Sequence, residues 1–370
     1  MKIKKLETFT KPFVSFLKIT SDTGAEGYGQ MSTYHADITA QIFHKQVAPW
    51  VLGKSCNSLE DIEDLENLVL EKEHKFPGSY ILRAIAGLDT AWWDMKGKLE
   101  NKPVVSLING NPGKLKVYGS SMKRDITPQE EADRFMKLED ECGISAFKFR
   151  LGSECGRNID EWPGRSEEII KIINKNLDPS SEKLVDANSC FTPKRAIELG
   201  HLLEENGINH YEEPCPYWEP EQTLEVTNAL TIDVTGGEQD CDLRIWRDMI
   251  NRKIVNIVQP DIMYMGGLTR ALKVAKMAEE KSIICTPHAA NLSLVTICTM
   301  HLLKAIPNAG KYLEFSIEGE DYYPWQKNLF LNNPFKIDDG KIMLSEDPGW
   351  GITINPQWIE ESNYAVSKID

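Results

Sequence analysis

Three short segments decide the fold of this chain: LVDAN at residues 184–188, NHYEEP at 209–214 and VTGGE at 234–238. Each is a brief apolar run that ends in polar residues, which is typical of a buried strand where it reaches the edge of a sheet. The acidic residues of the three segments recur every 26 residues. A strand with its crossover helix occupies roughly 30 residues, so the spacing predicts repeated β–α units and a parallel sheet.

The same pattern extends in both directions along the chain. After about residue 115, eight strand candidates alternate with helical stretches, which predicts an α/β fold built on a (β/α)8 barrel. These candidates are residues 117–119, 146–149, 184–186, 209–212, 234–236, 257–259, 283–285 and 312–314.

The chain before the barrel follows a different pattern, with strands first and helices after them. Residues 13–20 are predicted as a strand, and Gly24, Gly27 and Gly29 are predicted to mark turns. Helices are expected where apolar residues recur at helical spacing, over 37–50, 59–73 and 79–98.

Three parts are therefore expected along the chain. Residues 1–115 form an α+β domain, residues 116–320 form the barrel with the active site, and residues 321–370 pack back on the first domain.

The composition is that of an acidic globular protein. Of 370 residues, 41% are hydrophobic, and 56 acidic residues outnumber 42 basic ones, for a net charge of −14. This charge disfavours non-specific binding to nucleic acid or to an anionic membrane. No apolar run approaches the roughly 18 residues of a membrane span. The eight cysteines are scattered without a CxxC pair, so reduced cysteines and a cytoplasmic location are expected.

The three recurring acids, Asp186, Glu212 and Glu238, are candidate metal ligands. Active sites of such barrels lie at the C-terminal strand ends, and neighbouring strands are about 4.8 Å apart. Bare carboxylates at that spacing repel, and a hard cation relieves the repulsion, so all-oxygen ligation predicts Mg2+. The alternative is three separate helix caps or salt bridges, which the regular spacing disfavours. Adjacent strand residues face opposite sides, and the spacing favours Glu212 over Glu213 as the ligand.

Asp261 and His288 follow the next two strand ends and form a candidate dyad. A carboxylate that holds one imidazole nitrogen fixes the tautomer and makes the other nitrogen a general base or acid. A lone histidine at such a position is more often structural, but an acidic partner opposite a metal site favours catalysis.

Lys148 and Arg150 lie on one side of the second barrel strand, with Phe149 directed to the other. Facing a metal, the two cations can neutralise a substrate carboxylate. Arg150 carries a restriction, because a guanidinium stays protonated at neutral pH and is a poor base.

These residues resemble the mandelate racemase branch of the enolase superfamily over nearly the whole chain. The motifs are Leu88–Lys98, Val185-Asp186-Ala187-Asn188, Tyr211-Glu212-Glu213-Pro214, Gly236-Gly237-Glu238, Gln259-Pro260-Asp261 with Gly266-Gly267, Pro287-His288 and Leu313-Glu314. The resemblance implies an α+β capping domain and a modified (β/α)7β barrel. It also implies Mg2+ on the three carboxylates, a catalytic Asp261–His288 dyad, and a Glu314 that hydrogen-bonds the substrate carboxylate as it becomes an enediolate.

The sequence departs from that family at Arg150, where racemase-like members carry a second lysine as the opposing base. One strong base, His288, favours a sugar-acid dehydratase, which removes the proton α to a carboxylate, eliminates the β-hydroxyl and yields a 2-keto-3-deoxy acid. The alternatives are a racemase or epimerase of an α-hydroxy acid, a non-catalytic barrel used for binding, and a glycosidase with two acids.

The substrate is expected to be a small sugar-acid carboxylate. By the resemblance, two capping loops select it, which makes Tyr34 and His35 candidate substrate contacts, although both also fit ordinary surface loops. Asn188 lies two residues beyond Asp186 on the same face and is a third candidate. The family usually assembles, so a homo-oligomer is expected.

Overall fold

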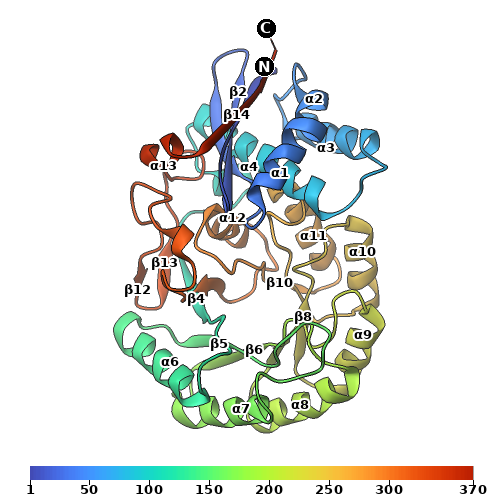
Figure 1. Cartoon of the computed structure of the whole chain (residues 1–370), viewed down its shortest axis with the longest axis vertical. Coiled ribbons are helices and arrows are strands. Elements are labelled where there is room, and N and C mark those ends of the chain that lie inside the picture. The colour runs from blue at the N-terminus through green and yellow to red at the C-terminus, as the bar shows by residue number, and fades with distance from the viewer. Residues whose placement is uncertain (370) are drawn as a thin grey trace.

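The computed structural model of the protein describes residues 1–369. Its first layer is a four-stranded antiparallel sheet in the order β14-β1-β2-β3. The strands are β1 Ile3–Lys11, β2 Val14–Ser21, β3 Glu26–Gln30 and β14 Asn363–Lys368. The last strand of the chain pairs with the first, from Lys5 with Lys368 to Thr10 with Asn363. Both termini therefore lie at the same end of the molecule (Figure 1).

Helical segments follow in this part of the chain, and α1 and α4 pack against the sheet. The helical segments are α1 Ala36–Ile42, the π-helical turn η1 Phe43–Val47, α2 Ala48–Val51, α3 Leu59–Lys72, α4 Ser79–Glu100 and α5 Val104–Leu107. The predicted helix over 37–50 is thus one helical run with a π-helical turn in its middle. The prediction for α3 is confirmed to within one residue, because Ser58 caps its N-terminus by accepting a hydrogen bond from the Asp61 N–H.

Two of the three glycines predicted at turns lie inside a strand instead. Gly24 does occupy a turn, with φ at 87°, but Gly27 and Gly29 belong to β3, against which α4 packs. A Cβ on Gly29 would come within 2.3 Å of the Ala91 nitrogen. The turn prediction was wrong for these two residues because the glycines allow a helix to approach a strand closely.

Eight parallel strands and seven helices then alternate along the chain. The strands are β4 Lys114–Ser120, β5 Ala146–Arg150, β6 Glu182–Asp186, β7 His210–Glu212, β8 Asp233–Gly236, β9 Ile257–Val258, β10 Ile284–Cys285 and β11 Leu313–Ser316. The helices are α6 Pro128–Cys142, α7 Arg165–Asn176, α8 Pro193–Glu205, α9 Pro220–Ala229, α10 Leu243–Arg252, α11 Leu268–Glu279 and α12 Leu294–Leu303. Each predicted strand is present.

The parallel strands form one curved sheet inside a ring of helices (Figure 1). Hydrogen-bonded neighbours run in sequence order from β4 to β10, and β11 returns to pair with β4. Between β10 and β11, Cys285 and Ala309 form a single bridge. This α/β order is consistent with the modified barrel that the resemblance implies. It also brings the C-terminal end of each parallel strand to the same face of the sheet.

The segment after β11 touches both parts of the molecule. It contains η2 Pro324–Gln326, β12 Ile337–Asp338, β13 Lys341–Met343 and α13 Pro356–Glu360 before β14. β13 pairs antiparallel with β4, whereas β14 joins the N-terminal sheet. Residues 321–369 therefore contact the parallel sheet as well as the first domain.

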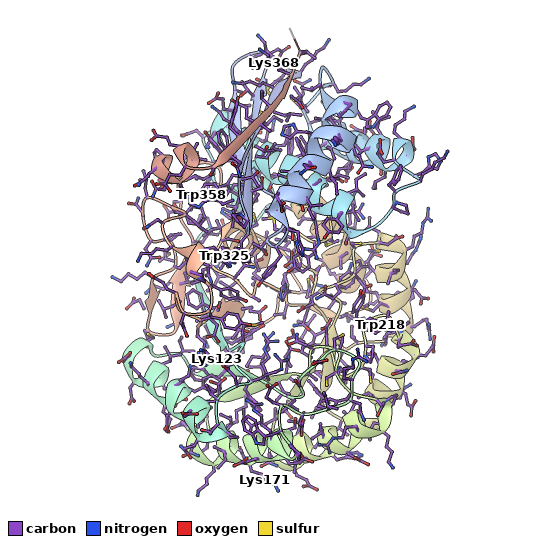
Figure 2. The ribbon with its side chains drawn as sticks, viewed as in Figure 1. Lys123, Lys171, Trp218, Trp325, Trp358 and Lys368 are labelled. Carbon is purple, nitrogen blue, oxygen red and sulfur yellow. The ribbon has the colours of Figure 1, made fainter. Side chains whose placement is uncertain are left out.

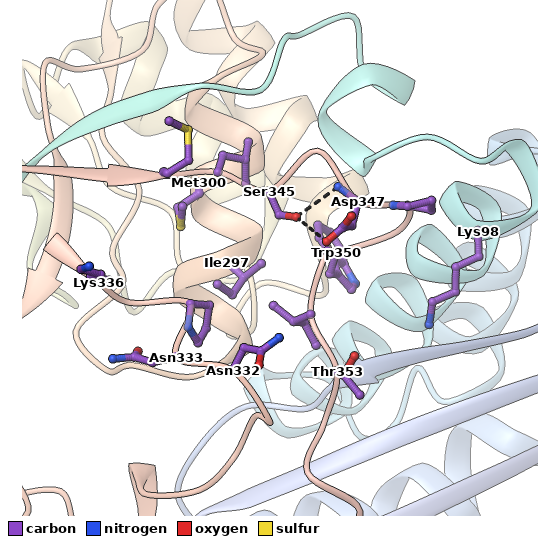
Figure 3. Close-up of a pocket in the computed structure, with 16 residues that line it drawn as sticks. Lys98, Ile297, Met300, Asn332, Asn333, Lys336, Ser345, Asp347, Trp350 and Thr353 are labelled. Carbon is purple, nitrogen blue, oxygen red and sulfur yellow. Dashed lines mark hydrogen bonds between the residues drawn. The ribbon is translucent and has the colours of Figure 1, made fainter. Parts of the chain in front are cut away.

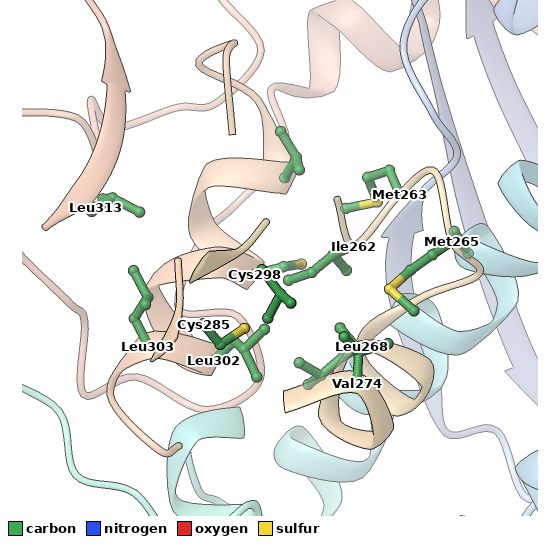
Figure 4. Close-up of a cluster of buried hydrophobic side chains, with 14 of the residues drawn as sticks. Ile262, Met263, Met265, Leu268, Val274, Cys285, Cys298, Leu302, Leu303 and Leu313 are labelled. Atoms are coloured by element: carbon green, nitrogen blue, oxygen red, sulfur yellow. The ribbon is translucent and has the colours of Figure 1, made fainter. Parts of the chain in front are cut away.

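A continuous apolar core joins the two parts. Figure 4 shows a portion in which Leu268 and Val274 of α11 meet Cys298 and Leu302 of α12. All eight cysteines are unpaired, as expected from their scattered positions. Within residues 1–369, no helix combines the length and the apolar character that crossing a bilayer demands.

Candidate active site

The predicted residues gather at the C-terminal ends of the parallel strands. Lys148 and Arg150 lie near the end of β5, and Asp186 and Glu212 are the last residues of β6 and β7. The register pairs Arg150 with Asp186 and Asp186 with Glu212. Glu238, Asp261 and His288 follow the ends of β8, β9 and β10, and Glu314 lies in β11.

Lys148 contacts several of the acids in one half of the site. It is fully buried, and its Nζ donates to Glu212 Oε2 at 2.7 Å and contacts Glu314 Oε1 at 2.8 Å. Asp186 Oδ2 lies 3.7 Å from the same nitrogen. One ammonium therefore links carboxylates from three strands, which allows them to be buried together.

Glu314 is held from two further directions. Its Oε1 accepts a hydrogen bond from Ser120 Oγ at 2.8 Å, and its Oε2 accepts one from the Ala289 N–H at 2.8 Å. Glu314 thereby connects β4 with the residue after His288, so it can hold both sides of the site in position.

Arg150 and Asn188 surround Asp186. Arg150 forms an ion pair with Asp186, and its Nε donates to the Ser121 carbonyl at 2.6 Å. Asn188 has a positive φ of 41°, which turns its backbone N–H toward Asp186 Oδ1 at 2.7 Å. Its side-chain Oδ1 accepts from Arg150 Nη1 at 3.0 Å. The structure thus brings Asn188 beside Asp186 and Arg150.

The other half of the site is the pair His288 and Asp261. His288 Nδ1 lies 2.7 Å from Asp261 Oδ2, and Asp261 Oδ1 accepts hydrogen bonds from the N–H groups of Met263 and Tyr264 at 2.7 and 2.9 Å. These contacts leave His288 Nε2 directed toward Glu238, whose Oε2 is 3.4 Å away. The imidazole therefore has one nitrogen held by a carboxylate and one facing the site.

Each acid is ionised only where nearby cations offset the rise in pKa that burial causes. Burial raises the pKa of Glu212, but Lys148, His210 and Arg150 together hold that pKa well below its usual range. Burial likewise raises the pKa of Glu314, and Lys148, His288 and the Ala289 N–H together lower it to about 2. Lys148 does not form an ion pair with Glu238. Burial therefore raises the pKa of Glu238, although the charges of His288 and Lys148 oppose the change. The negative charge of Glu238 is thus the least compensated of the three.

Burial alone would lower the pKa of His288, but Glu238 and then the hydrogen bond with Asp261 raise it to about 10. The neighbouring Glu213 is also buried, and burial, Glu238 and then Glu212 raise its pKa well above the usual range. Glu213 Oε2 accepts from Ser189 Oγ at 3.3 Å. Glu213 therefore lies beside the cluster, while Glu212 shares Lys148 with Asp186.

The predicted ligands are paired with cations in this structure. Among residues 1–369, no three His, Cys, Asp or Glu side chains already surround a common point as a metal-binding group. Instead, Asp186 pairs with Arg150, Glu212 with Lys148 and Glu238 with His288. The donors are nevertheless buried carboxylates on successive strands, and oxygen donors of this kind suit a hard divalent cation such as Mg2+.

The two capping-loop candidates lie in different surroundings. Tyr34 is 42% exposed, and its ring packs edge-on against Phe13 at 5.8 Å. Burial raises the pKa of Tyr34, and a hydrogen bond with Tyr323 opposes this change. Burial also raises the pKa of Tyr323, and the charge of Arg150 opposes that change. His35 is exposed, and its carbonyl accepts from Thr39 at the start of α1. No hydrogen bond or ion pair links either Tyr34 or His35 to the strand-end cluster among the described residues.

Sequence reasoning missed two residues of the cluster. Gln259 Nε2 donates to Glu212 Oε2 at 2.7 Å, and its place in the Gln259-Pro260-Asp261 motif was the available signal. Arg124 Nη2 donates to Asn188 Oδ1 at 2.6 Å. Arg124 lies in the loop after β4, and no periodic pattern marks it.

A cavity of about 710 Å³ lies elsewhere, between α12 and the C-terminal segment (Figure 3). Its lining includes Lys98, Ile297, Met300, Ser345, Asp347 and Trp350, and Ser345 and Asp347 hydrogen-bond each other. None of the predicted site residues lines it. Its one acid and its lack of histidine do not suit proton-transfer chemistry, so the strand-end cluster remains the candidate active site.

Both parts of the chain match known families. Residues 4–109 match the mandelate racemase/muconate lactonizing enzyme N-terminal domain, and residues 130–358 match the enolase C-terminal domain-like family.

Similar proteins include an arabinonate dehydratase from Saccharolobus solfataricus, 25% identical over 93% of this chain and 89% of the relative. A D-galactonate dehydratase from Xanthomonas campestris is 26% identical over 98% of this chain and 94% of the relative.

Solved structures of the same family are also similar to this chain. A Roseobacter denitrificans protein, solved as a candidate racemase, is 57% identical, and each chain is fully covered with a TM-score of 0.98. A mandelate racemase/muconate lactonizing protein from Paracoccus denitrificans, solved with magnesium, is 25% identical over 100% of this chain and 99% of that one, with a TM-score of 0.87. This chain therefore belongs to the mandelate racemase/muconate lactonizing enzyme family of the enolase superfamily.

Proposed function

We propose that this protein is a magnesium-dependent dehydratase of a sugar acid. It removes the proton α to the substrate carboxylate and eliminates the β-hydroxyl, and the enol product tautomerises to a 2-keto-3-deoxy acid. The names of the Saccharolobus and Xanthomonas relatives support this reaction class. The site would be carried by a (β/α)7β barrel over residues 116–320, beneath a capping domain formed by residues 1–115 and 321–370. We propose that the enzyme acts in the cytoplasm as a homo-oligomer.

The asymmetry of the site is the observation that carries the proposal. On one side, His288 is held by Asp261 at 2.7 Å and can exchange a proton through Nε2. On the other side, the corresponding position is Arg150, which is paired with Asp186 and stays protonated. One usable base suits an elimination, whereas racemisation requires a base on each face of the substrate.

Asp186, Glu212 and Glu238 would hold the Mg2+ ion. Nearby cations do not fully balance the negative charge of Glu238, whose pKa is raised by burial, and this supports the assignment. The magnesium in the Paracoccus neighbour supports it as well. When bound, the ion supplies a Lewis acid that stabilises negative charge on the substrate carboxylate.

Lys148 and Arg150 would stabilise the same developing charge. Lys148 is buried between Glu212 and Glu314, and these carboxylates raise its pKa above the ordinary lysine value despite its burial, so it acts as a fixed positive charge. Such a preorganised charge needs little rearrangement during the reaction. Glu314 positions Lys148. To donate a hydrogen bond to the enediolate oxygen, as the resemblance implies, Glu314 would first have to take up a proton, because Lys148 and His288 favour its ionised form.

His288 would take the α-proton and then return a proton to the departing hydroxyl. Asp261 keeps hydrogen on Nδ1, which leaves the Nε2 lone pair available. The charge of Glu238 favours the protonated imidazole. A cation on Glu238 would offset that charge and bring the pKa of His288 toward neutrality. One imidazole can then serve as both base and acid.

A racemase of an α-hydroxy acid is the second candidate, because the 57% identical Roseobacter protein was solved as a candidate racemase. The two reactions differ in their products. A racemase converts one C2 configuration into the other without forming a keto acid.

The deciding experiment incubates purified protein with a panel of sugar acids and Mg2+ and measures 2-keto acid formation. We expect the wild type to form keto acid and His288→Asn to form none. Inversion at C2 without keto acid would identify a racemase or epimerase. Hydrolysis of a glycoside that survives excess chelator would favour a glycosidase, and magnesium binding without turnover would favour a binding protein.

A further inference from the structure

Arg124 lies in the loop after β4, which Lys123 marks in Figure 2. Its Nη2 donates to Asn188 Oδ1 at 2.6 Å, and Arg150 Nη1 donates to the same oxygen at 3.0 Å. Two guanidinium groups therefore meet at one neutral acceptor, next to the proposed ligand Asp186.

Two cations near Arg124 have acidic partners: Arg150 pairs with Asp186, and Lys123 pairs with Asp321 at 2.9 Å. Within residues 1–369 no Asp or Glu oxygen reaches ion-pairing distance of Arg124 or of Arg165. Arg165 is buried and donates to the Arg150 carbonyl at 3.0 Å, whereas Arg124 lies in a partly exposed loop. The Nε of Arg124 is buried without a hydrogen-bond partner. Burial, Arg150 and then Arg165 lower the pKa of Arg124 to about 9. An anionic group from outside the chain would relieve this arrangement.

We propose that Arg124 binds a second carboxylate at the far end of the substrate, which makes the substrate a sugar diacid. The inference rests on the proposed function and specifies its substrate class. The reacting carboxylate would lie near Lys148 and Glu314. Because Asn188 contacts both arginines, a sugar chain running past it reaches Arg124.

The charge around Arg124 favours a carboxylate over a phosphate. The planar guanidinium fork can pair with either group through two parallel hydrogen bonds, so the number of unpaired charges distinguishes them. The charge of Arg150 is already balanced by Asp186, so the loop offers one unpaired positive charge. One unpaired charge matches a monoanionic group.

Arg83 of α4 is a second half-buried arginine without an acidic partner among the described residues. Its guanidinium stacks 3.5 Å above the ring of Tyr264 and donates to Ser32. A cation over an aromatic face is already stabilised, so Arg83 has less need of an external anion than Arg124.

The test compares a diacid with the monoacid of the same configuration. Wild-type kcat/KM is expected to be higher for the diacid, and Arg124→Gln should lower that value by about 10²-fold. The monoacid value should fall less than the diacid value, so the ratio of the two kcat/KM values is the readout. Arg124→Lys should restore part of the diacid activity. Lys123→Gln removes a neighbouring, already paired cation and should leave the preference unchanged.

Binding to the inactive variant His288→Asn, measured by calorimetry, tests Arg124 independently of turnover. If no sugar acid is dehydrated but the diacid binds more tightly and only through Arg124, the proposed reaction fails and this assignment stands. Preference for a monoacid or a phosphorylated acid would overturn the assignment. Equal losses for both acids in Arg124→Gln, or a loss of preference in Arg83→Gln alone, would also overturn it.

Discussion

His288 and His301 are both buried, with 6% and 0% of their surfaces exposed, but they lie in different surroundings. His288 lies between Asp261 at 2.7 Å and Glu238 at 3.4 Å. His301 lies on α12, where its Nδ1 accepts a hydrogen bond from the Val105 N–H at 2.8 Å and its ring packs edge-on against Trp350. Burial lowers the pKa of His301 to about 3, whereas Glu238 and Asp261 overcome burial and raise that of His288 to about 10.

This difference shows why burial alone does not produce a proton-transferring histidine. Burial favours the neutral imidazole in both regions. At the strand ends carboxylates oppose that effect and favour the protonated imidazole of His288. Substitutions in the two regions should therefore have different effects.

The largest expected effect comes from His288→Asn. Because the amide cannot carry the α-proton, kcat should fall by about 10³-fold. Formation of 2-keto acid from the preferred substrate measures the change. His301→Asn is the matched control and should retain wild-type kcat. Near-normal turnover by the His288 variant would remove the proposed base.

Asp261→Asn should lower kcat by about 10²-fold. The N–H groups of Met263 and Tyr264 hold Oδ1, so the new amide would turn its NH2 toward His288 Nδ1. The imidazole proton would then move to Nε2, which is the wrong tautomer for a base. Nitrogen-15 NMR of the ring can detect the change of tautomer. Unchanged kcat would mean that Asp261 has only a structural role.

Magnesium should stabilise the wild type and not Glu238→Gln. At a concentration of 100 times Kd, a ligand specific to the folded state adds about 2.7 kcal/mol, which thermal unfolding detects as a rise in Tm. Loss of a carboxylate ligand should remove most of that rise. Glu318→Gln, a buried acid paired with Arg134, should keep it. An equal magnesium-dependent rise in Tm for the wild type, Glu238→Gln and Glu318→Gln would contradict the proposed ligand set.

The smallest effect concerns acid stability and His301. Its folded pKa of about 3 is below its ordinary value of 6.5. The unfolded chain therefore takes up a proton first, and this contribution to stability, complete above pH 6.5, is lost as the pH falls toward 3. From pH 7 to pH 5, His301→Asn should lose about 2 kcal/mol less unfolding free energy than the wild type. Denaturant unfolding measures this, with exposed His201→Asn as control. If His301→Asn and the wild type lost the same unfolding free energy from pH 7 to pH 5, the lowered pKa of His301 would be contradicted.

The sequence predicted the strand ends well because each strand is a short local signal. Eight apolar runs matched the eight parallel strands, and Asp186, Glu212 and Glu238 lie on or just after three of them. The π-helical turn Phe43–Val47 was not predictable, since the helical pattern continues through it. Gly27 was misassigned to a turn because close packing against a helix leaves no separate mark on the sequence.

The sequence by itself determined which residue types stand at each strand end, because the β–α repeat places them in register on neighbouring strands. It therefore determined the acids, the histidine that we propose as the base, and the absence of a second lysine at Arg150. Only the tertiary structure decided how these charges are partnered. Lys148 joins Glu212 and Glu314, while Arg124 reaches Asn188 without an acid of its own. Such pairings depend on side chains that are distant in the chain and meet only when the sheet curves round, and local sequence patterns carry no information about those distances.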